Sequence, residues 1–367
     1  MTGRTLASIE TPALVIDAAR LHANVAAMAG TLAQAGVGLR PHFKTSKLIE
    51  VARLQREAGA VGFTCATPGE VAALLDAGFD GIFWANSPVG AKAALAARFS
   101  PRGDFAVGID SVALAEGLQA AAAQAGTRIR FLLEIDTGLG RTGIAAGDAL
   151  PVAAALREFD RLDLIGVYTH EGQLAALTGP RPELRAAGQL AGQRLVSVAG
   201  RLRAAGARIE RVSVGSTPGW DSAPFVPGVT EARPGTYVFF DANQLRLGSC
   251  DISQCAVTVL TSVVSTPRDG AAVIDAGLKA MSSDGANRGS GFGLPLTATR
   301  RLEPGLTFDV AYEEHGLLGG PLASGLAVGQ RMHIVPNHAC GVTNMWSHVY
   351  VVDGEDVIDD WAQVARH

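Results

Sequence analysis

Short apolar stretches alternate with helical patterns along residues 37–239. In the helical stretches, rich in Ala and Leu, apolar residues recur every three or four positions. Such alternation predicts an α/β fold with a parallel sheet covered by helices. Eight strands are the number of a (β/α)8 TIM barrel. The expected strands are 37–43, 60–66, 81–85, 105–109, 129–135, 164–169, 210–215 and 229–239, and helices are expected after Asp17 and at 68–77, 111–124, 145–157 and 182–204.

The pattern changes after about Asn243, where long helical stretches give way to β-branched runs. These runs lie at 256–265, 271–274, 307–311, 331–335 and 348–352. They predict a second, mainly β domain. The apolar stretch 11–16 precedes the first helix of the barrel, so we expect it to join that domain. The predicted division is therefore a barrel of residues 17–243, with residues 1–16 and 244–367 forming the β domain.

Composition excludes several classes of protein. The chain of 367 residues is 48% hydrophobic and 18% charged with a net charge of -4, which favours neither a nucleic acid nor a membrane surface as partner. The first twelve residues lack the apolar core of a signal peptide, and no apolar run reaches the ~18 residues that span a bilayer. The four cysteines are then expected to be reduced thiols or ligands. We expect a cytoplasmic protein.

The end of the first barrel strand carries unusual charges. If residues 37–43 are extended, Arg40, His42 and Lys44 share one face, because side chains alternate along a strand. Burying such groups is costly unless an anion lies among them. A phosphorylated cofactor held by a lysine would supply one, and a solvated basic loop is the alternative. Pro41 predicts that strand pairing ends near this point.

Other strand ends also carry polar groups, and in a barrel the carboxyl ends of the strands hold the functional site. The segments that follow the fifth to eighth strands are Asp136–Gly143, Tyr168–Gly172, Gly215–Gly219 and Arg233–Tyr237. Small residues with free amides after the seventh and eighth strands suit a phosphate. A plain tight turn is the alternative for the Gly-Ser-Thr segment.

Taken together, the motifs resemble a known family. They are Arg40–Lys47, Val61–Ala66, Asp136–Gly143, Gly166–His170, Arg233–Tyr237 and Asp275–Ala280, in this order. The sequence resembles the D-threonine aldolase and D-serine dehydratase family, which belongs to the alanine-racemase-like, fold type III pyridoxal-phosphate (PLP) enzymes. The resemblance covers most of the chain and implies an alanine racemase-like fold.

The resemblance also implies roles for single residues. Lys44 is expected to form the Schiff base with PLP, with Lys47 as the competing candidate. Arg141 and Arg233 are expected near the ring nitrogen or the phenolic oxygen of PLP. His170 is expected to lie against the cofactor and, with Lys44, to be catalytic. The residues expected around the phosphate are Ser216, Thr217, Gly235, Thr236 and Tyr237.

A second motif, Pro336–Cys340, suggests a metal site. If this segment is extended, His338 and Cys340 project to the same side, and imidazole with thiolate favours zinc. Two protein ligands leave positions open for water and substrate, and a buried free cysteine beside a polar histidine is the alternative. In the family resembled, histidine with aspartate is typical of D-threonine aldolases and histidine with cysteine of the dehydratases. Mn or Mg are the other metals considered, and Glu313–His315 could support the ligands.

The resemblance thus implies a PLP-dependent, divalent-metal-assisted lyase whose substrates are small D-configured β-hydroxy-α-amino acids. Retro-aldol cleavage of the D-threonine aldolase type is the first expectation. The alternative is D-serine dehydratase-type β-elimination, which yields a 2-oxo acid and ammonia. An amino-acid racemase and a non-catalytic PLP-binding protein are further readings. The family also leads us to expect a homodimer.

Overall fold

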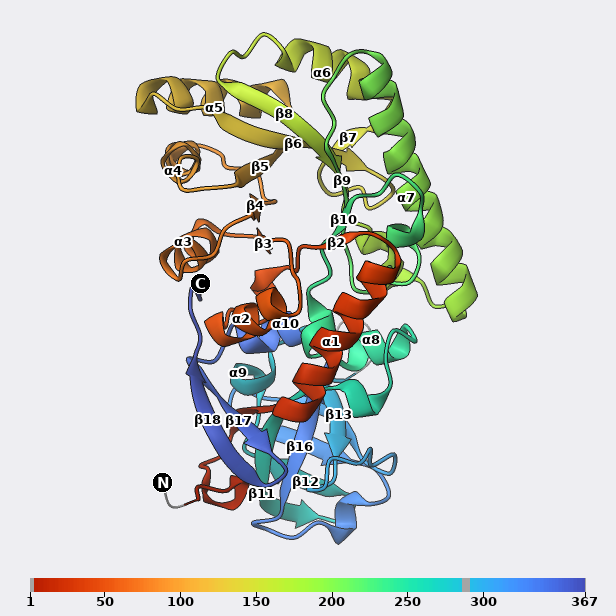
Figure 1. Cartoon of the computed structure of the whole chain (residues 1–367). Coiled ribbons are helices and arrows are strands. Elements are labelled where there is room, and N and C mark those ends of the chain that lie inside the picture. Colours follow the sequence, from red (N-terminus) through yellow and green to blue (C-terminus); the bar gives the residue numbers. More distant parts are fainter. Residues whose placement is uncertain (1–2, 286–290, 367) are drawn as a thin grey trace. The chain divides into compact units, whose positions relative to one another are not determined.

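The computed structural model describes residues 3–285 and 291–366. The chain divides into two compact units, which we call the barrel unit and the sheet unit (Figure 1). The barrel unit comprises Ala26–Lys44 and Val51–Gly235. The sheet unit comprises Met1–Val25, Thr45–Glu50 and Thr236–His367.

The barrel unit contains the predicted ring of parallel strands. Neighbours follow the order β2-β10-β9-β8-β6-β5-β4-β3. The ring closes between β2 and β3, where Val61 donates its amide to Leu39 (2.8 Å) and Thr64 to Pro41 (2.9 Å). The prediction of a (β/α)8 barrel is confirmed. The strands are β2 (Gly38–Leu39), β3 (Phe63–Cys65), β4 (Ile82–Trp84), β5 (Phe105–Ile109), β6 (Ile129–Asp136), β8 (Leu162–Tyr168), β9 (Arg211–Val214) and β10 (Glu231–Ala232), with the short β7 (Ile144–Ala145) beside β6.

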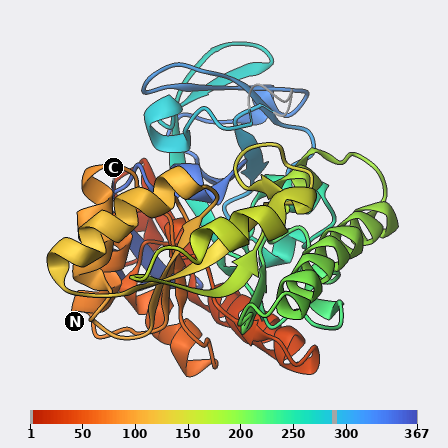
Figure 2. The same ribbon diagram turned by 90° about the horizontal axis from the view of Figure 1, so that it is seen from above.

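Helices follow the barrel strands because apolar residues at helical spacing give each helix one face to bury. The long helix α7, green in Figure 2, buries Leu184, Leu195 and Leu202 along one stripe. Helix α3 begins at Pro68, where the Thr67 hydroxyl accepts the Glu70 amide at 3.3 Å. The helices are α1 (Ala18–Gln34), α2 (Ile49–Glu57), α3 (Pro68–Asp76), α4 (Ala91–Phe99), α5 (Val112–Ala125), α6 (Ala149–Leu156) and α7 (Arg181–Ala204).

The sheet unit is built on a strand order of β14-β15-β12-β11-β1-β17-β18, with β16 joining β11 to β13. Strand β1 pairs antiparallel with β11 and parallel with β17. The N-terminal strand is therefore part of this sheet. The strands are β1 (Ala13–Asp17), β11 (Val257–Arg268), β12 (Ala271–Ile274), β13 (Gly293–Leu296), β14 (Thr307–Ala311), β15 (Gly316–Gly319), β16 (Arg331–Pro336), β17 (His348–Asp353) and β18 (Asp356–Ala362).

The first barrel strand is shorter than the predicted 37–43. Strand β2 ends at Leu39, and the chain forms a short 3-10 helix, η2 (Phe43–Thr45). Pro41 has no amide hydrogen to donate, which limits pairing here. A single bridge from His42 to Thr64 continues the ring. None of the helices in the described part of the chain has the length and apolar character needed to cross a bilayer.

Candidate active site

The structure distinguishes the two candidate lysines. Lys44 lies half-buried in η2, directly after the first barrel strand. Lys47 lies in the sheet unit, where its buried ammonium donates to Asn344 Oδ1 (2.7 Å) and to the carbonyl of Ala365 (2.9 Å). Lys47 is therefore used in packing the C-terminal segment, which favours Lys44 as the cofactor lysine.

Cationic groups gather around His42 in the barrel unit. Burial lowers the pKa of His42 well below its ordinary value, and the charges of Lys44, Arg233 and Arg141 lower it further; the ring of His170 also lies close to it. These side chains come from the ends of four different strands and are neighbours only in the folded barrel. A cluster of this kind is suited to an anionic ligand.

Arg40 does not belong to this cluster, although the predicted strand placed it on the same face as Lys44. Its Nε donates to Glu231 at 2.9 Å, and its Nη1 donates to the carbonyl of Gly81. Arg40 and Glu231 are both buried. A buried guanidinium requires a paired carboxylate, and Glu231 supplies it.

His170 is held in one orientation. Its Nδ1 lies 2.9 Å from the carbonyl oxygen of Gly215. Burial lowers the pKa of His170 to about 3, with the charge of Lys44 acting in the same direction. A neutral ring that donates from Nδ1 keeps Nε2 as an acceptor. His170 is therefore an uncharged ring in a cationic site.

The segment after β9 forms a tight turn. Ser216 Oγ accepts the amide of Gly219 at 3.2 Å, and the carbonyl of Thr217 accepts the amide of Trp220 at 3.2 Å. A Cβ at Gly219 would lie 3.0 Å from Ser216 Oγ, so a larger residue would disturb the turn. We call residues 215–219 the phosphate loop, because the sequence predicts that a phosphate binds there.

The other predicted phosphate residues lie at the end of the barrel unit and beyond it. Gly235 is half-buried, whereas Thr236 and Tyr237 belong to η6 (Thr236–Val238) in the sheet unit. Tyr237 is completely buried, and the Thr236 hydroxyl lies 3.9 Å from Cys340 Sγ. Thr236 is thus a neighbour of the predicted metal pair.

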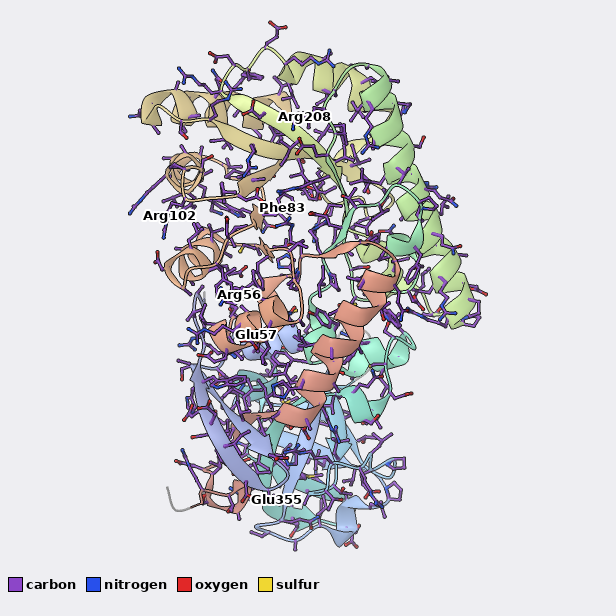
Figure 3. The ribbon with its side chains drawn as sticks, in the orientation of Figure 1. Arg56, Glu57, Phe83, Arg102, Arg208 and Glu355 are labelled. Carbon is purple, nitrogen blue, oxygen red and sulfur yellow. The ribbon has the colours of Figure 1, made fainter. Side chains whose placement is uncertain are left out.

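The two predicted arginines differ in setting. Arg233 is buried and lies over the rings of Tyr168 and Phe83, the latter labelled in Figure 3. Its Nη2 donates to the carbonyl of Thr169 at 2.6 Å, so part of its donor capacity is used inside the barrel. Arg141 is exposed and makes no hydrogen bond or ion pair within the described residues. Of these two arginines, Arg141 is the one whose N–H donors are not used by the described residues.

A network that the sequence did not predict supports the loop of Arg141. Asp136 Oδ1 accepts the amides of Gly138 (2.8 Å) and Leu139 (2.9 Å). Glu134 accepts the hydroxyls of Thr142 (3.0 Å) and Tyr168 (3.0 Å), and burial raises its pKa. The only sequence signal for Glu134 was a carboxylate inside an apolar strand.

Glu171 is a second buried carboxylate that sequence reasoning missed. Its two oxygens accept the amide of Gly215 at 3.1 and 3.0 Å, and burial raises its pKa. It follows His170 directly. His170 therefore bonds to the carbonyl of Gly215, and Glu171 bonds to its amide. Its position between the predicted catalytic histidine and a glycine was the signal available.

The predicted metal ligands lie at the end of β16. His338 is extended, but a short helix, α10 (Ala339–Thr343), begins at the next residue. The extended geometry expected for Cys340 is therefore wrong. The two side chains nevertheless meet, since they share a hydrogen bond. Cys340 is also the largest influence that raises the pKa of His338.

Asp241 is the carboxylate that orients His338. Its Oδ2 lies 3.2 Å from His338 Nδ1 and accepts the amide of Ala339 at 2.9 Å, which explains why the helix begins there. Asp241 is fully buried, and it takes the supporting role expected of Glu313 and Glu314. Those two glutamates are exposed and lie beside Lys279 instead.

The described residues fit both expected groups. The cationic cluster around His42 matches the charge of a phosphorylated, phenolate-bearing cofactor, and Lys44 lies within it. No group of three or more His, Cys, Asp or Glu suited to a metal is found in residues 3–285 and 291–366. The imidazole nitrogen of His338 and the thiol sulfur of Cys340 are donors that a borderline-soft ion such as zinc accepts.

Family models match both parts of the chain. The alanine racemase N-terminal domain matches residues 16–243, and the putative serine dehydratase domain matches residues 256–352. The first match covers more than half of the chain and corresponds to the stretch that contains the barrel strands.

Several relatives match along the whole length. D-threo-3-hydroxyaspartate dehydratase of Delftia sp. (strain HT23) is 35% identical, covering 98% of both chains. D-threonine aldolase of Arthrobacter sp is 32% identical, covering 99% of this chain and 94% of that protein.

Two solved structures of D-threo-3-hydroxyaspartate dehydratase variants are also similar. A histidine-to-alanine variant has a TM-score of 0.93 and 34% identity, covering 98% and 96% of the two chains. A cysteine-to-alanine variant in the metal-free form has a TM-score of 0.92 and 35% identity, covering 98% and 99%. The two substituted residues are two positions apart, the spacing of His338 and Cys340. This chain belongs to the D-threonine aldolase and D-serine dehydratase family of alanine-racemase-like, fold type III PLP enzymes.

Proposed function

We propose that this protein is a PLP-dependent, metal-assisted lyase of D-configured β-hydroxy-α-amino acids. The observation that carries the proposal is the cationic cluster of the barrel unit, in which Lys44, Arg141 and Arg233 surround His42 and the neutral ring of His170. The relatives named above include both aldolases and dehydratases, so the proposal covers both reactions.

In this proposal Lys44 holds the cofactor covalently. Ser216, Thr217 and Gly235 bind its phosphate, with Thr236 and Tyr237 completing the set predicted from the sequence. PLP supplies an electron sink for the bond that breaks at Cα. Arg141 has free donors for the cofactor's ring, whereas Arg233 positions the barrel wall through its bonds to backbone carbonyls.

His338 and Cys340 would hold the metal, and Asp241 fixes the tautomer of His338 through Nδ1. A divalent metal supplies a Lewis acid for the β-oxygen of the substrate. The nitrogen and sulfur donors favour zinc over Mn or Mg. We further propose that residues 17–243 form the PLP domain, that residues 1–16 and 244–367 form the metal domain, and that the enzyme is a homodimer.

β-Elimination is the second candidate reaction, and Cys340 is the observation that favours it over retro-aldol cleavage. The cysteine lies two residues after the histidine, which is the pattern that the resemblance associates with dehydratases. In the elimination, Lys44 Nζ would take the proton from Cα. In the cleavage, a base would instead take the proton of the β-hydroxyl, and the bond between Cα and Cβ would break.

Product analysis separates the two reactions. The purified protein is loaded with PLP and Zn²⁺ and incubated with D-threonine, D-serine or D-threo-3-hydroxyaspartate, with the L-enantiomers as controls. Cleavage of D-threonine gives glycine and acetaldehyde, and elimination gives 2-oxobutyrate and ammonia. A chelator is expected to abolish either reaction, and readdition of metal to restore it. Absence of all these products from every D-substrate would contradict the proposal.

A further inference from the structure

Glu171 has no role in the chemistry above, yet it is among the least exposed charged residues of the barrel unit. It is 1% exposed and follows His170 at the end of β8. Both of its carboxylate oxygens accept the amide of Gly215, and the carboxylate also bonds to the hydroxyl of Ser216. Its bonds thus reach the first two residues of the phosphate loop.

A small cavity lies behind the same loop. Its volume is about 10 Å³, and Glu171, Gly215, Ser216 and Trp220 are among the residues that line it. Trp220 Nε1 is buried and has no hydrogen-bond partner among the described side chains and backbone. Most of the lining of the cavity is apolar, from residues such as Leu32, Val214 and Pro234.

We propose that Glu171 is a positioning residue for the phosphate of the cofactor. Its carboxylate holds the Gly215 amide and the Ser216 hydroxyl from the inner side of the loop, so that the phosphate is met by the amides of Ser216 and Thr217. This inference rests on the proposed function, because it assumes that the phosphate binds at residues 215–219.

The charges around Glu171 are compatible with a phosphate bound at the phosphate loop. A carboxylate close to a phosphate would repel it, but Arg233 acts on Glu171 as the compensating cation. The amide of Gly215 is committed to Glu171 and its carbonyl to His170. Gly215 is therefore fixed from both sides, and the loop is ordered before a ligand arrives. Preordering lowers the entropic cost of binding.

The test compares two substitutions at Glu171 in the full-length protein. Glu171→Gln keeps an oxygen that accepts the Gly215 amide, whereas Glu171→Ala leaves that amide without a partner. We expect Glu171→Ala to raise the dissociation constant for PLP about tenfold or more, measured by absorbance titration. Hydrogen exchange at Gly215 should also accelerate in this variant without ligand. Glu171→Gln should stay close to the wild type in both measurements.

Glu70→Ala is the matched control. Glu70 is also a buried glutamate of the barrel unit that accepts a backbone amide, that of Ala66 at 2.7 Å. This control should lose stability without a change in the affinity for PLP. If Glu171→Ala does not fold, Glu171→Asp replaces it, because the shorter side chain withdraws the carboxylate from Gly215.

Two results would overturn the inference while leaving the proposed function intact. The first is wild-type affinity for PLP in Glu171→Ala. The second is an equal loss of affinity in Glu171→Ala and Glu171→Gln. A wild-type protein that binds no PLP would instead overturn the proposed function and this inference together.

Discussion

Asp241 Oδ2 lies 3.2 Å from Nδ1 of His338, and the two residues are 97 positions apart in the sequence. The same oxygen accepts the amide of Ala339. A carboxylate in this place fixes the imidazole so that Nε2 is free to bind a metal. The geometry of the metal pair is thus set by a residue that is not itself expected to be a ligand.

Replacing Asp241 with asparagine should therefore weaken metal binding by about 10- to 100-fold. Asparagine keeps the size of the side chain and its capacity to cap helix α8 (Ala242–Arg246), but it removes the charge. Competition with a coloured chelator measures the affinity for Zn²⁺. Glu314→Gln, which alters only a surface ion pair with Lys279, serves as the control. Equal affinities in the two variants would refute this role of Asp241.

Replacing Cys340 with aspartate should change the preferred metal. A carboxylate is a harder ligand than a thiolate, so we expect lower affinity for Zn²⁺ and relatively higher affinity for Mn²⁺. We also expect a larger share of cleavage products from D-threonine. Metal analysis and product ratios are the measurements, and Cys340→Ser separates loss of the thiolate from gain of the carboxylate. An unchanged metal preference would argue against Cys340 as a ligand.

Borohydride reduction of the PLP-loaded protein should attach a pyridoxyl group to Lys44. Peptide mass spectrometry locates the group, and Lys44→Ala should remain unlabelled. Lys47→Met should be labelled as the wild type is, but it should lose about 1–3 kcal/mol of stability, because Asn344 and Ala365 lose their buried donor. A label on Lys47 would reverse the assignment.

His170 should remain neutral across the physiological range. Its pKa is lowered to about 3, so the ring carries no charge above about pH 5. The bond to Gly215 predicts that Nδ1 carries the proton. Nitrogen NMR shifts of ¹⁵N-labelled histidines report both properties, and His170→Asn assigns the signal. A titration midpoint near the ordinary histidine value of about 6.5 would contradict this expectation.

His333 should make the stability of the sheet unit depend on pH. It is 1% exposed, and burial lowers its pKa to about 3. Between about pH 3 and 6.5 the unfolded chain binds a proton that the folded chain does not, so the free energy of unfolding falls as the pH falls. The slope from this residue is up to about 1.4 kcal/mol per pH unit.

Urea unfolding of the wild type and of His333→Gln measures this slope. The variant should lose it, whereas the replacement of an exposed histidine, His315→Gln, should not change it. A wild-type slope in His333→Gln would assign the pH dependence to other groups.

Much of the barrel could be predicted because its signals are local. Each barrel strand is a short apolar run between helical patterns, and all eight were found in order. The strand β18 was missed for a local reason as well. Asp356, Asp359 and Asp360 interrupt its apolar pattern, and most of the strand is exposed at the edge of its sheet.

The candidate site was predictable only where a residue lies in a recognisable motif. Lys44 and His338 lie in such motifs. Asp241, Glu134 and Glu171 do not, since their significance comes from partners elsewhere in the chain. Arg40 was misplaced because alternation along a strand was extended past Leu39, where the strand ends.

The position of β1 between β11 and β17 has a consequence during protein synthesis. Ala13 pairs with Leu260, and Val15 pairs with Tyr350. Strand β1 must therefore wait until β11 and β17, which lie far later in the sequence, have been synthesised. The barrel strands between β1 and β11 are complete much earlier. We expect the barrel strands of the nascent chain to fold first. The sheet that joins β1 to β11 and β17 should form last.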